Sequence, residues 1–328
     1  MSGGILVSFS VDADALRASE LPLPLRIATH RRLLDCWQRY GVLVLFGPSL
    51  EESAVFSALT DLPQALRKRW QELLKRGRRR VASPRNGDPS RVESLAELAP
   101  LARGVELFCF DEVRAHVLGV PEDAFSIALD DGAVEICRFD CADQAEAFRR
   151  AERLGEREIE AQSLVANVWS ERFAPLLEHS RTLTVVDRYA LKGLVDRPDG
   201  QSGLRRLLTE IDAGDRARQL TLFSASQVDY SHSALLGAID DRVKACRRGG
   251  LREVKLYLSD DRSFGRIAHY RYLRFDQTLC QLDVGLDVLA GREVYRTCTF
   301  RLTSLSDVVR SEETALRESA QLFVFTPR

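Results

Sequence analysis

The chain has 328 residues, of which 45% are hydrophobic and 29% are charged, enough apolar material for two cores of ordinary size. Its formal net charge is −1, from 47 basic and 48 acidic residues, so no overall field draws the whole molecule to nucleic acid or to an acidic membrane. Any site for an anion must therefore be local.

The apolar stretches indicate a protein without a membrane span. The longest, such as residues 41–47, have the length of a strand, and the first residues lack the basic and apolar regions of a signal peptide. Seven cysteines form no C-x-x-C pair, which favours reduced thiols over a structural zinc site. We therefore expect a cytoplasmic protein.

The first part of the chain alternates strand-like and helix-like segments. Strands are expected at 5–11, 42–46, 104–110 and 133–139, and helices at 25–40, 61–74 and from 140 to about 161. The basic segment 78–90 has the composition of a loop. This order predicts an α/β domain over residues 1–150.

The remainder predicts a second α/β domain. Helices over 151–181 form a linker, and strands are expected at 182–186, 219–224 and 254–258, with helices near 203–211 and 233–246 between them. The second domain covers 182–328. Each domain is expected to be a mostly parallel or mixed sheet flanked by helices.

Acidic residues follow several of the expected strands in the first domain. Hard divalent cations need several oxygens converging from different strand ends, and the opening around Asp12 resembles that of PIN-like nuclease domains. The resemblance implies a Mg²⁺ or Mn²⁺ site formed by Asp12, Asp14, Asp111, Glu135, Asp140 and Asp143. The alternative is that the acids only cap helices that follow strands.

A basic segment of the same domain could contact a nucleic acid backbone. We expect phosphate contacts, with Trp70 nearby for stacking on a base, from Arg69, Lys75, Arg78, Arg79 and Arg80. The alternative is a solvated helix end whose cations complement the helix dipole.

The second domain contains the pattern H-x-R-x4-D at His269, Arg271 and Asp276. With residues 185–189 and 283–289, it resembles the phospholipase D-like family, in the single-motif form at the C-terminus of the MIT-domain midbody protein that partners ESCRT assemblies. The resemblance implies a nucleophilic imidazole, a cation for phosphate oxygens and an orienting carboxylate at these three positions. It further implies phosphate binding by Arg271, Asp287, Tyr189 and Asp187.

The departures from the family pattern favour binding over cleavage. Only one motif is complete, and Arg271 replaces the family's lysine. The second candidate, at His179, is one residue too long, and its alternative is a histidine at a helix end. Homodimerisation would supply a second imidazole across a twofold axis. The alternative for His269 is a strand histidine bonded to Asp276 or Asp287, with Arg271 in a surface ion pair.

These features together suggest a nucleic-acid-directed phosphodiesterase, acting as a nuclease or effector in a bacterial antiphage defence or toxin system. Protein partners encoded with it would then be expected. Cleavage would be metal-dependent in the first domain, or metal-free phospholipase D chemistry in the second. The alternative function is a non-catalytic adaptor whose second domain binds a phospholipid headgroup, a nucleotide or a protein partner.

Overall fold

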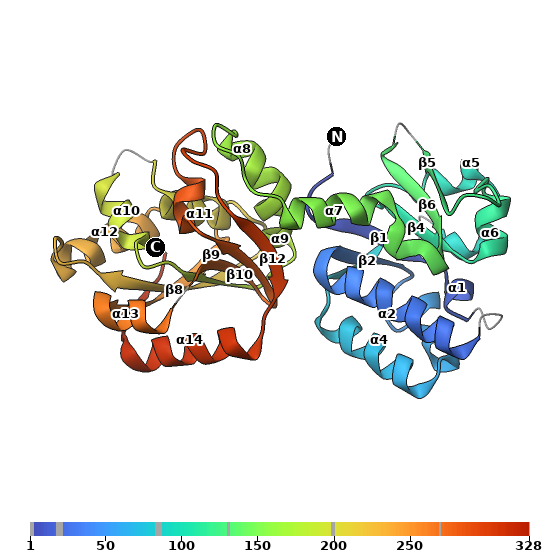
Figure 1. Cartoon of the computed structure of the whole chain (residues 1–328), viewed down its shortest axis with the longest axis horizontal. Helices are drawn as coiled ribbons and strands as arrows, with labels where there is room; N and C mark the ends of the chain where they lie inside the picture. Colours follow the sequence, from blue (N-terminus) through green and yellow to red (C-terminus); the bar gives the residue numbers. More distant parts are fainter. Residues whose placement is uncertain are drawn as a thin grey trace. The chain divides into compact units, whose positions relative to one another are not determined.

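The computed structural model describes residues 3–17, 22–82, 87–129, 132–197, 201–268 and 270–327. The chain divides into two compact units, Met1–Leu154 and Gly155–Arg328. Each is a mixed α/β unit with one sheet, which confirms the predicted fold class (Figure 1). The division falls within helix α7 (Glu146–Glu156).

The first unit is built on a six-stranded sheet in the order β3-β2-β1-β4-β6-β5. All neighbouring strands are parallel except β5, which is antiparallel to β6. The strands are β1 (Val7–Val11), β2 (Gly41–Phe46), β3 (Arg79–Ala82), β4 (Leu107–Phe110), β5 (Ser126–Leu129) and β6 (Val134–Arg138). The chain reverses its direction of travel across the sheet between β1 and β4, where ligand sites of open α/β sheets lie.

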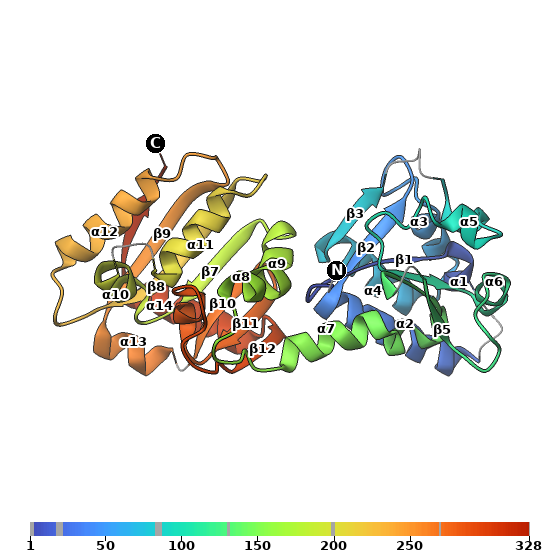
Figure 2. The same cartoon turned by 90° about the horizontal axis from the view of Figure 1, so that it is seen from above.

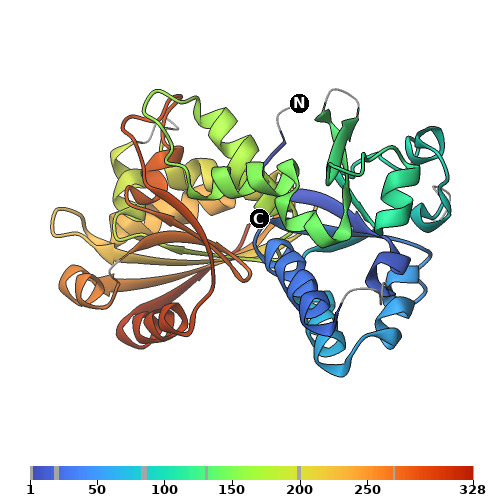
Figure 3. The same ribbon diagram turned by 45° about the vertical axis from the view of Figure 1, so that its right-hand side comes forward.

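The helices of this unit connect and cover the strands. They are α1 (Ala13–Arg17), α2 (Leu23–Tyr40), α3 (Ala54–Ala58), α4 (Gln64–Arg76), α5 (Leu95–Leu98) and α6 (Glu112–Val117), with short 3₁₀ turns at Leu59–Asp61, Pro89–Arg91 and Phe139–Gln144. Helices α2 and α4 lie side by side (Figures 1 and 3). They are joined by the buried rings of Trp37 and Trp70, 5.7 Å apart between centroids.

Three segments of this unit differ from the expectation. The helix expected from 140 to about 161 is a 3₁₀ turn (Phe139–Gln144) followed by α7, which ends at Glu156, and the strand β5 was not expected. Residues 79–82 form the edge strand β3, paired in parallel with β2, where a loop was expected. An edge strand needs a partner on one side only and tolerates charged side chains. The loop prediction for 78–90 followed from the turn-forming residues after position 82, and it therefore missed the short strand that precedes them.

The second unit is built on a seven-stranded sheet in the order β12-β11-β10-β7-β8-β9-β13 (Figure 2). Strands β7, β8 and β9 are parallel, and the other neighbouring pairs are antiparallel. The strands are β7 (Thr182–Val186), β8 (Arg218–Ser226), β9 (Leu251–Asp260), β10 (Arg271–Phe275), β11 (Thr278–Leu282), β12 (Phe300–Ser304) and β13 (Gln321–Phe325).

Helices cover both faces of this sheet. Helices α13 (Asp261–Ile267) and α14 (Asp307–Ser319) lie on one face, where Phe264 and Leu316 join a buried cluster (Figures 1 and 3). The other face carries α10 (Ala190–Asp196), α11 (Gly203–Asp212) and α12 (His232–Lys244). The remaining elements are α8 (Val165–Val168), a π-helical turn (Trp169–Phe173), α9 (Ala174–Glu178) and a 3₁₀ turn (Gly285–Leu289). Among the described residues, no helix combines the length and the apolar character needed to cross a membrane.

Candidate anion site in the second unit

The carboxyl end of β7 places a buried carboxylate at the edge of the sheet. Asp187 directly follows β7 and is 4% exposed. Its Oδ2 accepts a 2.7 Å hydrogen bond from the backbone N–H of Leu286, and its Oδ1 accepts one of 3.0 Å from the N–H of Tyr189. Burial raises the pKa of Asp187, while these two donors and the nearby Arg271 oppose that rise. The carboxylate thus ties the 285–289 turn to the end of β7.

Arg271 lies beside this carboxylate because of the strand register. Tyr272 of β10 pairs with Val186 of β7, so the residue before Tyr272 faces the one after Val186. The guanidinium carbon of Arg271 lies 4.9 Å from the centroid of the Tyr189 ring. Within the described part of the chain, this guanidinium donates no hydrogen bond, so its N–H groups are available to a ligand.

Gly285 allows these groups to approach one another. Its φ is +62°, in the left-handed region, and a Cβ there would lie 2.3 Å from Oδ2 of Asp187 and 2.8 Å from Cδ of Arg271. Asp287 follows in the same turn, and its Oδ1 pairs with Arg197 at 3.2 Å. We call Asp187, Tyr189, Arg271, Gly285 and Asp287 the Asp187 cluster.

Four predicted phosphate-binding residues therefore come together: Arg271, Asp287, Tyr189 and Asp187. The sequence analysis did not identify Arg197, which reaches the cluster from the end of α10, nor the structural role of Gly285. The neighbouring Arg188 pairs with Asp261, which also accepts a 3.0 Å bond from Gln227, so this arginine is already engaged.

Asp276, the last residue of the H-x-R-x4-D pattern, is not brought to this cluster. Asp276 lies in the turn after β10, at the end opposite Arg271, with φ +49°. It accepts hydrogen bonds from the N–H groups of Arg181 (3.1 Å) and Thr182 (2.9 Å) at the start of β7. With about 3.3 Å per strand residue, the length of β10 separates it from Arg271. His269 lies outside the described residues, and His179 is the C-cap residue of α9.

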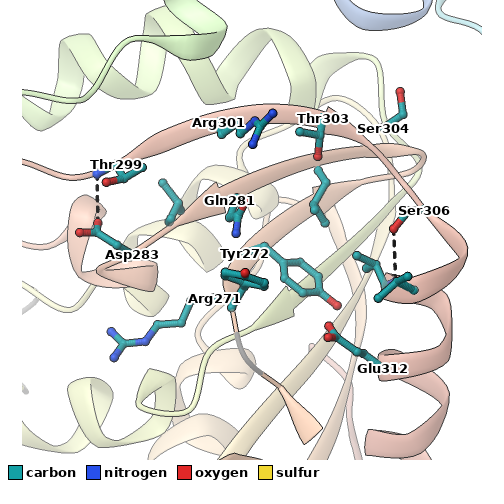
Figure 4. Close-up of a pocket in the computed structure, with 15 residues that line it drawn as sticks. Arg271, Tyr272, Gln281, Asp283, Thr299, Arg301, Thr303, Ser304, Ser306 and Glu312 are labelled. Atoms are coloured by element: carbon teal, nitrogen blue, oxygen red, sulfur yellow. Dashed lines mark hydrogen bonds between the residues drawn. The ribbon is translucent and has the colours of Figure 1, made fainter.

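A groove of about 880 Å³ lies over the face of β10, β11 and β12 that carries α14, and Arg271 contributes to its lining (Figure 4). Alternate strand residues such as Gln281 and Arg301 line it, together with Ser306 and Glu312 from the start of α14. The hydrogen bond from the N–H of Thr299 to Asp283 closes one end. The guanidinium of Arg271 extends away from Gln281 and Glu312 (Figure 4), and it lies over the ring of Tyr189.

In the first unit, Asp12 is the most unusual of the predicted metal ligands. It follows β1 and its side chain is fully buried, with Oδ2 3.4 Å from Nε of Arg114. Neither atom has a hydrogen-bond partner among the described residues. Burial raises the pKa of Asp12 to about 6, against the lowering effects of the Asp14 N–H and Arg114. Its free oxygen borders a small cavity with Asp88.

The other predicted ligands are engaged in local structure. Asp111 caps α6, Glu135 accepts the N–H groups of Glu146 and Ala147, and Asp140, Asp143 and Asp14 pair with Arg138, Arg32 and Arg17. Side-chain caps and ion pairs of this kind occur without any metal. Among the described residues, no group of three or more His, Cys, Asp or Glu is placed to hold a metal ion.

A second set of acids, which the sequence did not indicate, lies near Asp12. A groove of about 890 Å³ opens beside the end of β2 and shares Phe46, Ala54 and Asp88 with the small cavity. Its lining includes the acids Glu51, Glu52, Asp88 and Glu97. These residues lie in loops and short helices, where the sequence showed no strand end to mark them.

The predicted nucleic-acid-binding residues are dispersed. Arg78 donates to the carbonyls of Gln38 and Arg39, Arg80 to that of Gly104, and Arg69 pairs with Asp35. Lys75 lies in the last turn of α4 and Arg79 on β3. Trp70 is fully buried, with its Nε1 donating to Nδ1 of His30 at 3.1 Å, so it is not available to stack on a base.

Comparison with known proteins adds no assignment to this geometry. The sequence matches no known family model and no curated protein sequence.

Proposed function

We propose that the second unit is a binding module for a phosphate-bearing ligand, which it holds at the Asp187 cluster. The observation that supports this most directly is the guanidinium of Arg271, which packs on Tyr189 and has donors not shared with any described residue. A guanidinium donates paired N–H bonds in a geometry that suits phosphate oxygens. The buried carboxylate of Asp187 lies beside it and favours its position.

The site also has a favourable place in the fold. It lies at the carboxyl ends of the parallel strands, the edge where open α/β sheets bind ligands. The same edge carries Gln227 after β8 and Asp261 after β9. Binding is favoured over cleavage because Asp276, which would orient a nucleophilic imidazole, is held at the far end of β10.

Calorimetric titration of the full chain with inorganic phosphate tests the proposal. Arg271→Ala should weaken binding by about tenfold or more, as loss of a charge-assisted pair does. The phosphate affinity of Arg271→Lys should lie between those of the wild type and Arg271→Ala, because lysine keeps the charge but loses the paired N–H donors and the contact with the Tyr189 ring. The matched control is Arg252→Ala, an exposed arginine at the amino end of β9, which should leave affinity unchanged. Equal affinity of wild type and Arg271→Ala would refute the assignment.

Titration with larger phosphate-bearing molecules in the same assay identifies the kind of molecule that carries the phosphate. Adenosine monophosphate, glycerol 3-phosphate and a 5′-phosphorylated oligonucleotide present the same group on a nucleotide, a lipid-type headgroup and a nucleic acid end. Tighter binding of one of them than of inorganic phosphate, lost in Arg271→Ala, identifies the class of ligand. Equal weak binding of all three would limit the function to phosphate itself.

A second candidate function is phosphodiester cleavage in the first unit, which is supported by Oδ2 of Asp12, a buried oxygen that accepts no hydrogen bond from the described residues. A carboxyl group with a pKa of about 6 is suited to proton transfer near neutral pH. Cleavage of single-stranded RNA and DNA should be assayed with Mg²⁺, with Mn²⁺ and with chelator. Loss of activity in Asp12→Asn, but not in Asp61→Asn on the same unit, would support it. Activity retained in chelator and lost in His269→Ala would instead assign cleavage to the second unit, and no cleavage under any condition would refute both.

A further inference from the structure

The outer edge of β13 is exposed in a way that protein sheets usually avoid. Strand β13 (Gln321–Phe325) is the last strand of its sheet and pairs with β9 on one side. No strand within the described part of the chain pairs with its other side. Free sheet edges are templates for further pairing, and natural proteins block them with charges, prolines or bulges. The sequence Gln-Leu-Phe-Val-Phe contains none of the blocking residue types.

Its apolar side chains are also unusually accessible. Leu322 is 48% exposed and Val324 is 52% exposed, while Phe323 and Phe325 are half-buried. Leu322 and Val324 share one face, because side chains two residues apart on a strand point the same way. The edge therefore presents both unpaired backbone groups and apolar side chains.

The opposite edge of the same sheet gives an internal comparison. In β12 the apolar residues Phe300 and Leu302 are 1% and 6% exposed, and Arg301 between them faces solvent. This is the ordinary arrangement of a protected edge, with apolar side chains inside and a charge outside. The two edge strands of this sheet thus differ in the exposure of their apolar side chains and in the presence of a charge, and both properties control association through a sheet edge.

We propose that β13 pairs antiparallel with β13 of a second copy of this chain, which extends the sheet across a twofold axis. A twofold interface brings a patch against itself, so the patch must be self-complementary. An uncharged strand meets this condition because no like charges face each other across the pair. With the axis at Phe323, Leu322 lies opposite Val324 of the second copy, and the exposed side chains of both copies are covered. The pairing is closed and leaves no further free edge at this strand.

Sedimentation velocity of the full chain, between about 1 and 100 µM, tests the proposal over the usual range of homodimer affinities. The wild type should change from monomer to dimer in this range. Leu322→Lys/Val324→Lys places lysines directly opposite each other and should raise the dissociation constant by at least about tenfold. Leu322→Glu/Val324→Lys places a glutamate opposite a lysine in the same register and should keep the dimer. Val308→Lys, at a site on α14 that is 69% exposed, is the control and should sediment as the wild type does.

Each result has a definite consequence. A wild type that stays monomeric throughout would overturn the proposal, as would a folded Lys/Lys variant that dimerises as well as the wild type. If the Glu/Lys variant is as monomeric as the Lys/Lys variant, the register is wrong. Hydrogen exchange gives a readout that needs no variant: the amides of residues 321–325 should become more protected as wild-type concentration rises. Protection that does not change with concentration would also overturn the proposal.

Discussion

Replacement of Gly285 by alanine should destabilise the second unit. The residue has φ +62°, a conformation that costs an L-amino acid about 1–2 kcal/mol. The added methyl group would lie 2.3 Å from Oδ2 of Asp187, so the carboxylate or the turn must move away. That movement breaks the 2.7 Å bond from Leu286, and a hydrogen bond to a charged group contributes about 1.5–3 kcal/mol. The combined loss is about 2.5–5 kcal/mol.

The matched control is Gly237→Ala in the same unit. Gly237 lies within α12, is exposed, and has open space where a Cβ would lie. Alanine there should stabilise the helix by about 0.5–1 kcal/mol, because glycine loses more backbone entropy on folding. The same substitution is thus expected to act with opposite signs at two positions of one unit.

Scanning calorimetry of the full chain can measure both effects. Two units need not unfold together, and the transition that Gly237→Ala moves upward identifies the second unit. In a unit of this size 1 kcal/mol shifts the midpoint by about 2–4 °C, so Gly285→Ala should lower the same transition by roughly 5–20 °C. Phosphate affinity should fall as well, because Asp187 and Arg271 are displaced together. An unchanged midpoint for Gly285→Ala would refute the reasoning about this turn.

Three further substitutions test buried charges. Glu313→Gln should lower the free energy of unfolding, measured by urea denaturation, by about 3–5 kcal/mol, because the Glu313 carboxylate accepts two 2.7 Å hydrogen bonds from the buried guanidinium of Arg274. The double change Arg274→Met/Glu313→Leu should recover much of this loss. A loss below about 1 kcal/mol in Glu313→Gln would contradict the reasoning. The pKa of Asp12 is raised to about 6, so its stabilising contribution is complete below pH 3.8 and is lost as the pH rises through 6. The free energy of unfolding of the wild type relative to Asp12→Asn should therefore fall by about 2–3 kcal/mol between pH 4 and 7, and parallel pH profiles would refute this. Asp276→Ala should lower the free energy of unfolding by about 2–3 kcal/mol, because it removes the acceptor of the Arg181 and Thr182 N–H groups, and it should leave phosphate affinity unchanged. A loss of affinity equal to that of Arg271→Ala would contradict a purely structural role for Asp276.

The buried parallel strands were predictable because their sequences carry the pattern in full. Every residue of β2 is buried, and its run of apolar and β-branched residues needs no tertiary information to be identified as a strand. The edge strands β3 and β13 were not predicted. Their burial is partial, so tertiary pairing with β2 and β9, and not a periodic pattern, determines that they are strands.

The residues of the candidate site could be predicted from the sequence only where they lie at adjacent strand ends on the same side of the sheet. Asp187 and Arg271 meet because β7 and β10 are adjacent and antiparallel, and the family resemblance named both residues without that register. The same motif grouped Asp276 with Arg271, although a strand that lies between two residues carries them to opposite ends of the sheet. For Asp12, the sequence could not give Arg114 as its neighbour, since that contact depends on the packing of α6 after β4.

At the carboxyl ends of the parallel strands, the buried aspartate has hydrogen-bond donors in the second unit but lacks one at Oδ2 among the described residues of the first. This difference determines what each site can bind. In the second unit, backbone N–H groups satisfy the acid Asp187, so the nearby guanidinium of Arg271 keeps its donors for an anion. In the first unit, no described residue donates a hydrogen bond to Oδ2 of Asp12, and Nε of Arg114 lies 3.4 Å from this oxygen without a hydrogen bond. An acceptor left in this state binds a proton or a donor group, not an anion. Phosphate should therefore select the second unit alone, and its binding should persist in Asp12→Asn.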